Sequence, residues 1–277
     1  VENANINISD NNFVDLNWDT TNAIRVSNYT SANATITLNG NSYSTHGPDT
    51  GKNYAGLLIF QITNNKDDLT KLNVVVNDLK TDFDGQLYYT YKDGVGLTSE
   101  NEAVFHGDDS IAKYFVAKVG DTYYKTLSAA VAAAQSGETV KLLANIAEGA
   151  TIPADKTVTL DLNGKNIKPT TGDAIVNKGN LTIVGSGEVA AQNGGSAAIA
   201  NFPGATANVN GGTFVSAHWY VIKNLGNMTI DGPVTIKKPD GNTDTSSLID
   251  NGWYGSTDKV AGESVSAQAD KAKLIKS

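Results

Sequence analysis

Cysteine is absent from this chain of 277 residues, and arginine occurs once, at Arg25. The first absence excludes disulfides, thiolate metal sites and cysteine nucleophiles. The second leaves almost nothing for the bidentate recognition of carboxylate or phosphate groups. Charged residues make up 18% of the chain and the formal net charge is -8, which argues against binding to nucleic acid or to anionic membrane surfaces.

Long apolar runs are also missing. No run approaches the roughly 20 residues that a bilayer-spanning helix needs, so we expect no membrane insertion. The chain starts at Val1 without a signal-peptide pattern, which predicts a processed product or an excised fragment. What is abundant is Asn, Thr, Gly and Tyr, a composition that suggests a secreted, β-rich surface protein.

The second half of the sequence contains an internal repeat. Each copy has a short β-branched segment, a turn with Asn and Gly, a second β segment, and then Gly with a third. The copies cover residues 173–189, 197–214 and 220–236, and a fourth opens at 248–255. The matching isoleucines, spaced by 24, 23 and 27 residues, are Ile175, Ile199, Ile222 and Ile249.

This period, with three short strands in each copy, predicts a parallel β-solenoid whose stacked coils share one core. A leucine-rich repeat would need a ladder of Leu residues that does not accompany the period. A sandwich or propeller would need two-residue hairpin turns between the strands, and these are not present.

The first half repeats less regularly. Segments of strand length lie at residues 4–13, 22–28, 34–43, 56–65 and 71–80. Ile6 aligns with Ile36 at a spacing of 30 residues, and Ile36 aligns with Val74 at 38, which predicts longer coils with loop insertions. The predicted division is an irregular solenoid segment at 1–96, a polar connector at 97–115 and a second solenoid segment at 116–277.

Three motifs follow one another in the middle of the chain. They are GDTYYKTLSAAVAAA at 120–134, GETVKLL at 137–143 and TVTLDLNGKNI at 157–167. Together they resemble the opening of right-handed parallel β-helix domains, of the pectate-lyase-like fold, in bacterial cell-surface and adhesin proteins of the Gram-positive type. The resemblance implies an all-β fold and a location at a bacterial cell surface, with a virion as the alternative. It implies little about function, because these helices serve many roles.

One run in this segment, TLSAAVAAAQ at residues 126–135, predicts an α-helix. Thr126 suits the N-cap and Gly137 suits the position after the helix. The predicted buried stripe is Leu127, Ala130, Val131 and Ala134. The end of a β-solenoid exposes apolar side chains and unpaired strand edges unless something covers it. We therefore expect the helix to cap or separate two solenoid segments.

The two ends of the chain suggest a hypothesis of self-association. The end-stacking residues would be Ile6 and Ile8 in the first coil and Leu274 and Ile275 in the last. Stacking of the last coil on the first coil of the next molecule does not close, so it would build a filament. The expected partners are another copy, head to tail, or neighbouring β-helix repeats.

Enzyme activity is the main alternative, because parallel β-helices include polysaccharide lyases, hydrolases and tailspike depolymerases. Residues 242–244 reproduce an Asn-Thr-Asp triplet of polygalacturonases, but the family's acidic, histidine and basic partner motifs do not follow it. His106, Asp108 and Asp109 have no second His nearby. Acidic turns that could bind Ca²⁺ contain Asp67, Asp68, Asp78, Asp82 and Asp84. We predict that none of these is catalytic, and we predict no metal site and no cofactor.

Aromatic residues are the remaining positive signal for binding. The candidates are Trp219, Tyr220, Trp253 and Tyr254. On successive coils they would form a platform for the sugar rings of a host or cell-wall glycan; alternatively, they cover long loops or pack inside the coils. The sequence thus favours a non-enzymatic, extracellular structural or adhesive module. The alternatives are a polysaccharide-active enzyme and a glycan-binding module.

Overall fold

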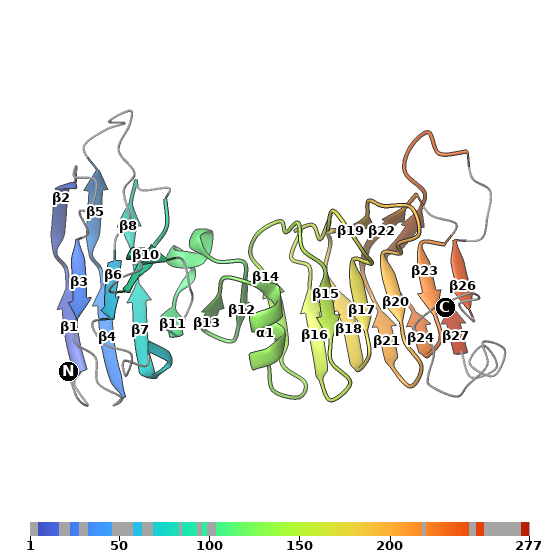
Figure 1. Cartoon of the computed structure of the whole chain (residues 1–277), viewed down its shortest axis with the longest axis horizontal. Helices are drawn as coiled ribbons and strands as arrows, with labels where there is room; N and C mark the ends of the chain where they lie inside the picture. The colour runs from blue at the N-terminus through green and yellow to red at the C-terminus, as the bar shows by residue number, and fades with distance from the viewer. Residues whose placement is uncertain are drawn as a thin grey trace. The chain divides into compact units, whose positions relative to one another are not determined.

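The computed structural model of the chain describes residues 5–16, 23–27, 33–45, 58–62, 69–82, 85–92, 96–98, 104–217, 220–243, 248–251 and 273–276 (Figure 1). The chain divides into two compact units. Unit 1 comprises Val1–Phe115 with Asp121–Lys125, and unit 2 comprises Val116–Gly120 with Thr126–Ser277. Strands predominate in both units and most neighbouring strands run parallel, so the predicted all-β class is confirmed.

Unit 1 contains three sets of hydrogen-bonded strands. The first set is β1 (Asn5–Ser9), β4 (Ala34–Asn39), β7 (Leu72–Asn77), β11 (Val104–Gly107) and β13 (Thr122–Tyr124). The second is β2 (Asn12–Leu16), β5 (Ser42–Thr45) and β8 (Lys80–Thr81), and the third is β3 (Ile24–Ser27), β6 (Leu58–Ile62), β9 (Tyr88–Lys92) and β10 (Gly96–Thr98). From β1 to β9 the chain enters the three sets in the same order three times. The antiparallel pairs are β9 with β10 and β11 with β13.

The predicted alignment of the first half is confirmed. Ile6 pairs with Ile36 between β1 and β4, and Ile36 pairs with Val74 between β4 and β7. Alternate side chains of β4 and β7 are buried, as expected for strands with one face on a core. Short 3₁₀ helices occur at Leu69–Lys71 and Asp109–Tyr114.

Unit 2 also has three sheets, which we name A, B and C. Sheet A contains β12 (Ala117–Val119), β14 (Thr139–Leu142), β16 (Thr157–Asp161), β18 (Asn180–Val184), β21 (Thr206–Val209), β24 (Asn227–Ile230) and β27 (Lys273–Lys276). Sheet B contains β19 (Glu188–Ala191), β22 (Gly212–Ser216) and β25 (Val234–Lys237). Sheet C contains β15 (Ala150–Ile152), β17 (Ile175–Asn177), β20 (Ile199–Asn201), β23 (Ile222–Asn224) and β26 (Ile249–Asn251).

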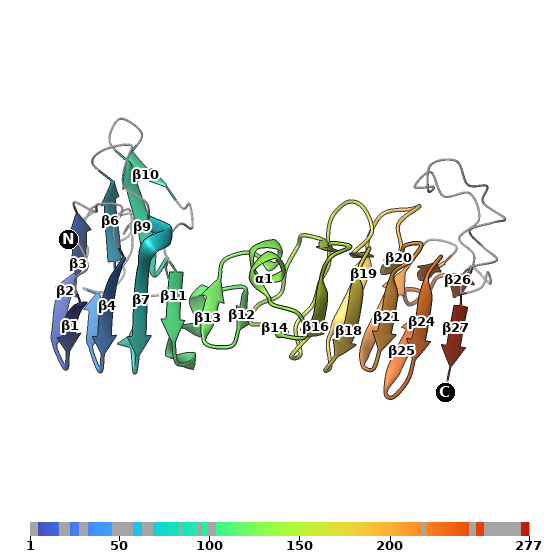
Figure 2. The same ribbon diagram turned by 90° about the horizontal axis from the view of Figure 1, so that it is seen from below.

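From β18 onward successive strands belong to sheets A, B and C in strict rotation. Each new strand runs parallel to its neighbour in the same sheet. Figure 2 shows β18, β21 and β24 side by side in sheet A. The four isoleucines that define the sequence repeat lie in register on β17, β20, β23 and β26, which confirms the predicted alignment. The first three of them are fully buried.

Helix α1 spans Leu127–Ala133, two residues short of the predicted end, which is the usual uncertainty of a helix terminus. The Thr126 side chain accepts a hydrogen bond from the backbone N–H of Ala129, so the predicted N-cap is confirmed. The predicted apolar stripe, Leu127, Ala130, Val131 and Ala134, is buried. The helix lies against β12, β14 and β15 of its own unit.

Charged side chains from the two loops that flank β15 hold both ends of α1. Glu148 Oε1 accepts a hydrogen bond from the N–H of Leu127 at the first turn, at 3.2 Å. Lys156 Nζ donates to the carbonyl oxygens of Ala132 and Ala134 at 2.6 and 2.9 Å. An anion at the start of a helix and a cation at its end both complement the helix dipole.

The range 97–115, predicted as a polar connector, contains ordered structure. β11 pairs with β7 in parallel, and the 3₁₀ helix at Asp109–Tyr114 buries Ile111. The apolar run at this strand, Val104 and Phe105, is short and lies between polar residues, so the sequence did not indicate a strand here. The predicted division of the chain into segments at 1–96, 97–115 and 116–277 stays a prediction.

Candidate functional site

A ladder of buried asparagines runs along the ends of the strands of sheet C. Asn177, Asn201 and Asn224 are completely buried, and the Nδ2 atom of each donates to the Oδ1 atom of the next at 2.7 Å. Asn224 Nδ2 continues the ladder to Asn251 Oδ1, also at 2.7 Å. Every link joins one repeat to the next, so the ladder stabilises their register.

The same side chains also hold the turn that leads from sheet C to sheet A. Asn177 Nδ2 donates to the carbonyl oxygen of Thr206 at 2.9 Å, and Asn201 Nδ2 donates to that of Asn227 at 3.0 Å. Asn177 Oδ1 accepts from the N–H of Gly179 at 3.2 Å. Buried amides with several partners avoid the cost of unsatisfied polar atoms.

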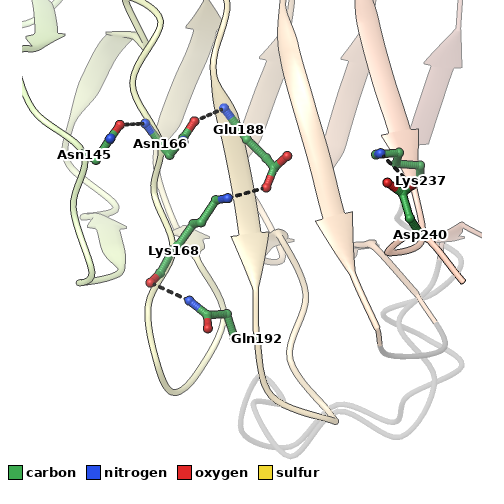
Figure 3. Close-up of polar contacts among 7 residues, drawn as sticks. All are labelled: Asn145, Asn166, Lys168, Glu188, Gln192, Lys237 and Asp240. Carbon is green, nitrogen blue, oxygen red and sulfur yellow. Dashed lines mark hydrogen bonds and ion pairs between the residues drawn. The ribbon is translucent and has the colours of Figure 1, made fainter. Parts of the chain in front are cut away.

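A second line of polar contacts crosses neighbouring repeats on the surface (Figure 3). The N–H of Asn166 donates to Asn145 Oδ1 at 2.9 Å, and the N–H of Glu188 donates to Asn166 Oδ1 at 3.0 Å. Lys168 Nζ lies 2.8 Å from Glu188 Oε1, and Gln192 Nε2 donates to the Lys168 carbonyl oxygen at 3.1 Å. These polar groups form hydrogen bonds and an ion pair with one another, so their arrangement indicates a structural role.

Two rows on the outer face of sheet A carry one chemical type of side chain over five successive strands. One row, in register across the strands, is Thr139, Thr159, Thr182, Asn208 and Thr229. The neighbouring row is Thr157, Asn180, Thr206 and Asn227. We call these nine residues the Thr/Asn face. The residues between them in each strand, such as Val158, Leu181 and Ala207, point inward and are buried.

The side chains of the Thr/Asn face are largely unpartnered. Asn180 Nδ2 donates to Thr157 Oγ1 at 3.3 Å. Among the residues that the structure describes, the other seven side chains of the face make no hydrogen bond within the chain. None of the nine carries a charge; the next row begins with Lys141 paired to Asp161 in register. The face therefore presents free hydroxyl and amide groups to its surroundings.

Sequence reasoning did not single out this face or the asparagine ladder. The signals were the alternation of Thr or Asn with an apolar residue in TVT, NLT, TAN and NMT, and the Asn-x-Gly turns at 177–179 and 224–226. Both patterns are also expected of ordinary strands and turns, so the sequence alone did not separate these roles.

Lys125 in unit 1 lies in an unusual environment for an amine. Burial lowers the pKa of Lys125 to about 8. Its Nζ lies 4.1 Å from the centre of the Tyr88 ring and donates to Gln86 Oε1. Tyr88 stacks on Phe105 with ring centres 4.4 Å apart. A cation held by an aromatic face and one amide is adequately explained as part of the core of the unit.

The predicted aromatic platform is described at one position. Tyr220 is half-buried and follows sheet B on the way to β23. Trp219, Trp253 and Tyr254 lie outside the described residues. A platform formed by these four aromatic residues stays a prediction.

The polar cluster at residues 106–109 forms a helix cap. Asp108 accepts from the N–H and hydroxyl of Ser110, and from the N–H of Asp78 at 2.8 Å. Burial opposes ionisation, but these hydrogen bonds outweigh it and hold the pKa of Asp108 below its usual value. His106 Nδ1 lies 3.0 Å from Thr122 Oγ1 and 3.4 Å from Asp121 Oδ1.

The other candidates for chemistry are placed as follows. The N–H of Asn242 donates to the Pro239 carbonyl in a turn, while Asp244 lies outside the described residues. Asp78 pairs with Lys80 at 3.0 Å. Asp67, Asp68 and Asp84 also lie outside the described residues. Within the described parts of the chain, no three His, Cys, Asp or Glu side chains gather as metal ligands would.

The predicted end-stacking residues lie in two strands. Ile6 and Ile8 are half-buried in β1, which pairs with β4. Leu274 and Ile275 belong to β27, which pairs with β24, and their side chains lie outside what the structure describes.

The described segments contain no helix long and apolar enough to cross a membrane. In comparison with known proteins, no family model, no curated protein and no solved structure matches the chain.

Proposed function

We propose that this chain is a non-enzymatic structural and adhesive module, folded as right-handed parallel β-helix segments and exposed at a bacterial surface. The observation that carries the proposal is the in-register recurrence of three parallel sheets in unit 2, joined by the buried asparagine ladder. Each repeat buries the apolar side chains of its neighbours, as in a solenoid. Right-handed coils are the expected choice because connections between parallel strands of one sheet are almost always right-handed.

A stack of this kind suits a module that must keep an outward surface in place outside a cell. Proteases act mainly on segments that open locally. In unit 2 the strand ends are tied between repeats by side-chain amides, which opposes such opening. The repeated strands also multiply any group that faces outward, so the same chemistry appears at regular intervals.

The location is tested by labelling intact source cells with an antibody raised against unit 2. We expect labelling without permeabilisation, at a level that permeabilisation does not raise. Labelling of virions instead would favour the alternative location. Labelling seen only after permeabilisation would contradict a surface module.

The non-enzymatic assignment is tested by incubating the purified chain with pectin, polygalacturonate and bacterial capsular polysaccharides. We expect neither new reducing ends nor unsaturated products. Release of either product at a rate proportional to protein concentration would support the polysaccharide-active enzyme and refute the assignment.

A second candidate function is head-to-tail assembly into a filament. Ile6 and Ile8 are half-buried, whereas their register partners on β4, Ile36 and Leu38, are each 3% exposed. Covering these two isoleucines with the strand of another copy would remove apolar surface from water.

Sedimentation velocity over a range of concentrations, with electron microscopy, tests the assembly. We expect the double variant Ile6→Lys/Ile8→Lys to remain monomeric where the native chain associates. Asn5→Lys/Asn7→Lys is the matched control, because it adds the same charge to the opposite face of β1. A native chain that stays monomeric at all concentrations would refute the filament.

A further inference from the structure

We infer that the Thr/Asn face of unit 2 adsorbs to an insoluble, uncharged polysaccharide whose chains offer hydroxyl groups at regular intervals. The inference rests on the proposed adhesive function and gives it a surface and a ligand class. The aromatic platform predicted from sequence plays no part in it.

The nine residues of the Thr/Asn face carry no charge, although Lys141 and Asp161 lie in the next row of the same sheet, and we therefore expect the ligand to be uncharged. Nine outward positions on five successive strands carry only Thr or Asn, although the chain as a whole is 18% charged. Thr is enriched in strands and Lys and Glu are depleted, so the six Thr follow from strand propensity. Asn is disfavoured in strands, so Asn208 in the middle of β21 is not explained by strand propensity. An uncharged, hydrogen-bonding face fits an uncharged polyhydroxyl ligand.

The strands hold the face in place, and seven of its nine side chains make no hydrogen bond within the described residues. Neighbouring positions in one row are about 4.8 Å apart and the two rows about 6.6 Å apart, as the geometry of parallel strands dictates. Six of the nine side chains are Thr, whose branched Cβ restricts the side-chain rotamer. Little conformational entropy is therefore lost when these groups bind.

Because each hydrogen bond between the face and a sugar is weak, we expect the ligand to be a polymer. A hydrogen bond between neutral groups strengthens binding in water only about fivefold, so one or two sugars would not bind measurably. The face also lacks an aromatic ring on which a single sugar could stack. Many weak interactions made at once with an immobile, repeating surface can give tight adsorption. Short soluble oligosaccharides are therefore expected to compete poorly.

The same pattern occurs in unit 1, in a separate set of strands. Asn5 pairs in register with Thr35, and Asn7 with Thr37, between β1 and β4. These side chains are exposed or half-buried, while Ile36 between the two threonines is buried. In β7 the two rows continue with Asn73 and Val75, so the pattern in unit 1 is complete only on β1 and β4.

Adsorption to washed microcrystalline cellulose and to chitin particles tests the inference. The test variant is Thr159→Val/Thr182→Val/Thr229→Val, which removes three hydroxyls from one row and preserves side-chain shape and strand propensity. Because each hydroxyl that binds the polymer contributes about a fivefold factor, removing all three should lower the adsorption constant by about a hundredfold.

The matched control is Thr151→Val/Thr213→Val/Thr235→Val, which removes three outward hydroxyls from sheets B and C. We expect this control to bind like the native chain, with both variants keeping the native urea midpoint. Equal losses in the two variants, or no adsorption of the native chain to either polymer, would overturn the inference. Retention of the native chain in growing ice without polysaccharide binding would also overturn it, in favour of ordered water. Surface labelling of cells together with failed adsorption would refute this inference alone.

Discussion

Replacing Asn201 by alanine removes the middle link of the asparagine ladder in unit 2. The side chain accepts one hydrogen bond from Asn177 Nδ2, and it donates to Asn224 Oδ1 and to the Asn227 carbonyl oxygen, at 2.7, 2.7 and 3.0 Å. The substitution removes three hydrogen bonds, and their former partners lie where water cannot readily take the place of the amide. At about 1 to 1.5 kcal/mol for each, the free energy of unfolding should fall by about 3 to 5 kcal/mol.

The control for this variant is Asn251→Ala at the exposed position of the same ladder. It removes the hydrogen bond from Asn224 Nδ2, but Asn251 is exposed, so water can take its place. We expect a loss below about 1 kcal/mol. Urea unfolding monitored by circular dichroism measures the free energy of unfolding of both variants, with one common slope of free energy against urea concentration. A loss for Asn201→Ala no larger than that for Asn251→Ala would refute the reasoning that the buried ladder holds the repeats together.

Three further predictions concern single residues. Because burial lowers the pKa of Lys125 from 10.5 to about 8, the unfolded chain binds more protons between these values and stability should rise with pH. After allowance for partial exposure the rise is about 1 kcal/mol from pH 8 to pH 9.5; urea midpoints should show it, and Lys125→Met should abolish it. Thr126→Ala should lower the stability of unit 2 by about 1 kcal/mol through loss of the helix cap, while Thr126→Ser should keep it. Gly179→Ala should cost about 3 kcal/mol or prevent folding, because its Cβ would lie 2.2 Å from the Pro153 carbonyl oxygen. Gly194→Ala meets no atom within 4 Å and should be tolerated, so equal thermal midpoints for the two glycine variants would contradict the clash.

The parts of the fold that were predictable are those fixed by hydrophobic periodicity. Ile175, Ile199 and Ile222 were aligned from spacing alone and lie in register, because a shift by one residue would turn every apolar side chain outward. The helix was equally clear, since Thr126 and the Ala-rich run agree with each other. The strand β11 was missed because a short strand that pairs on both sides needs few apolar residues of its own.

The polar features could not be predicted in the same way, because their role depends on which face they occupy. Asn201 and Asn208 are the same residue type seven positions apart, yet Asn201 is fully buried with its amide bonded on both sides, and Asn208 is on the outer face without a partner. Burial makes the first a stability determinant, since an unmade hydrogen bond there is costly. The second is half-buried on the outer face, and its unbonded amide can bind something else. In the sequence both residues are asparagines in a turn-rich repeat. Only the register of the sheets distinguishes residues such as Asn201, which stabilise the chain, from residues such as Asn208, which are available to a ligand.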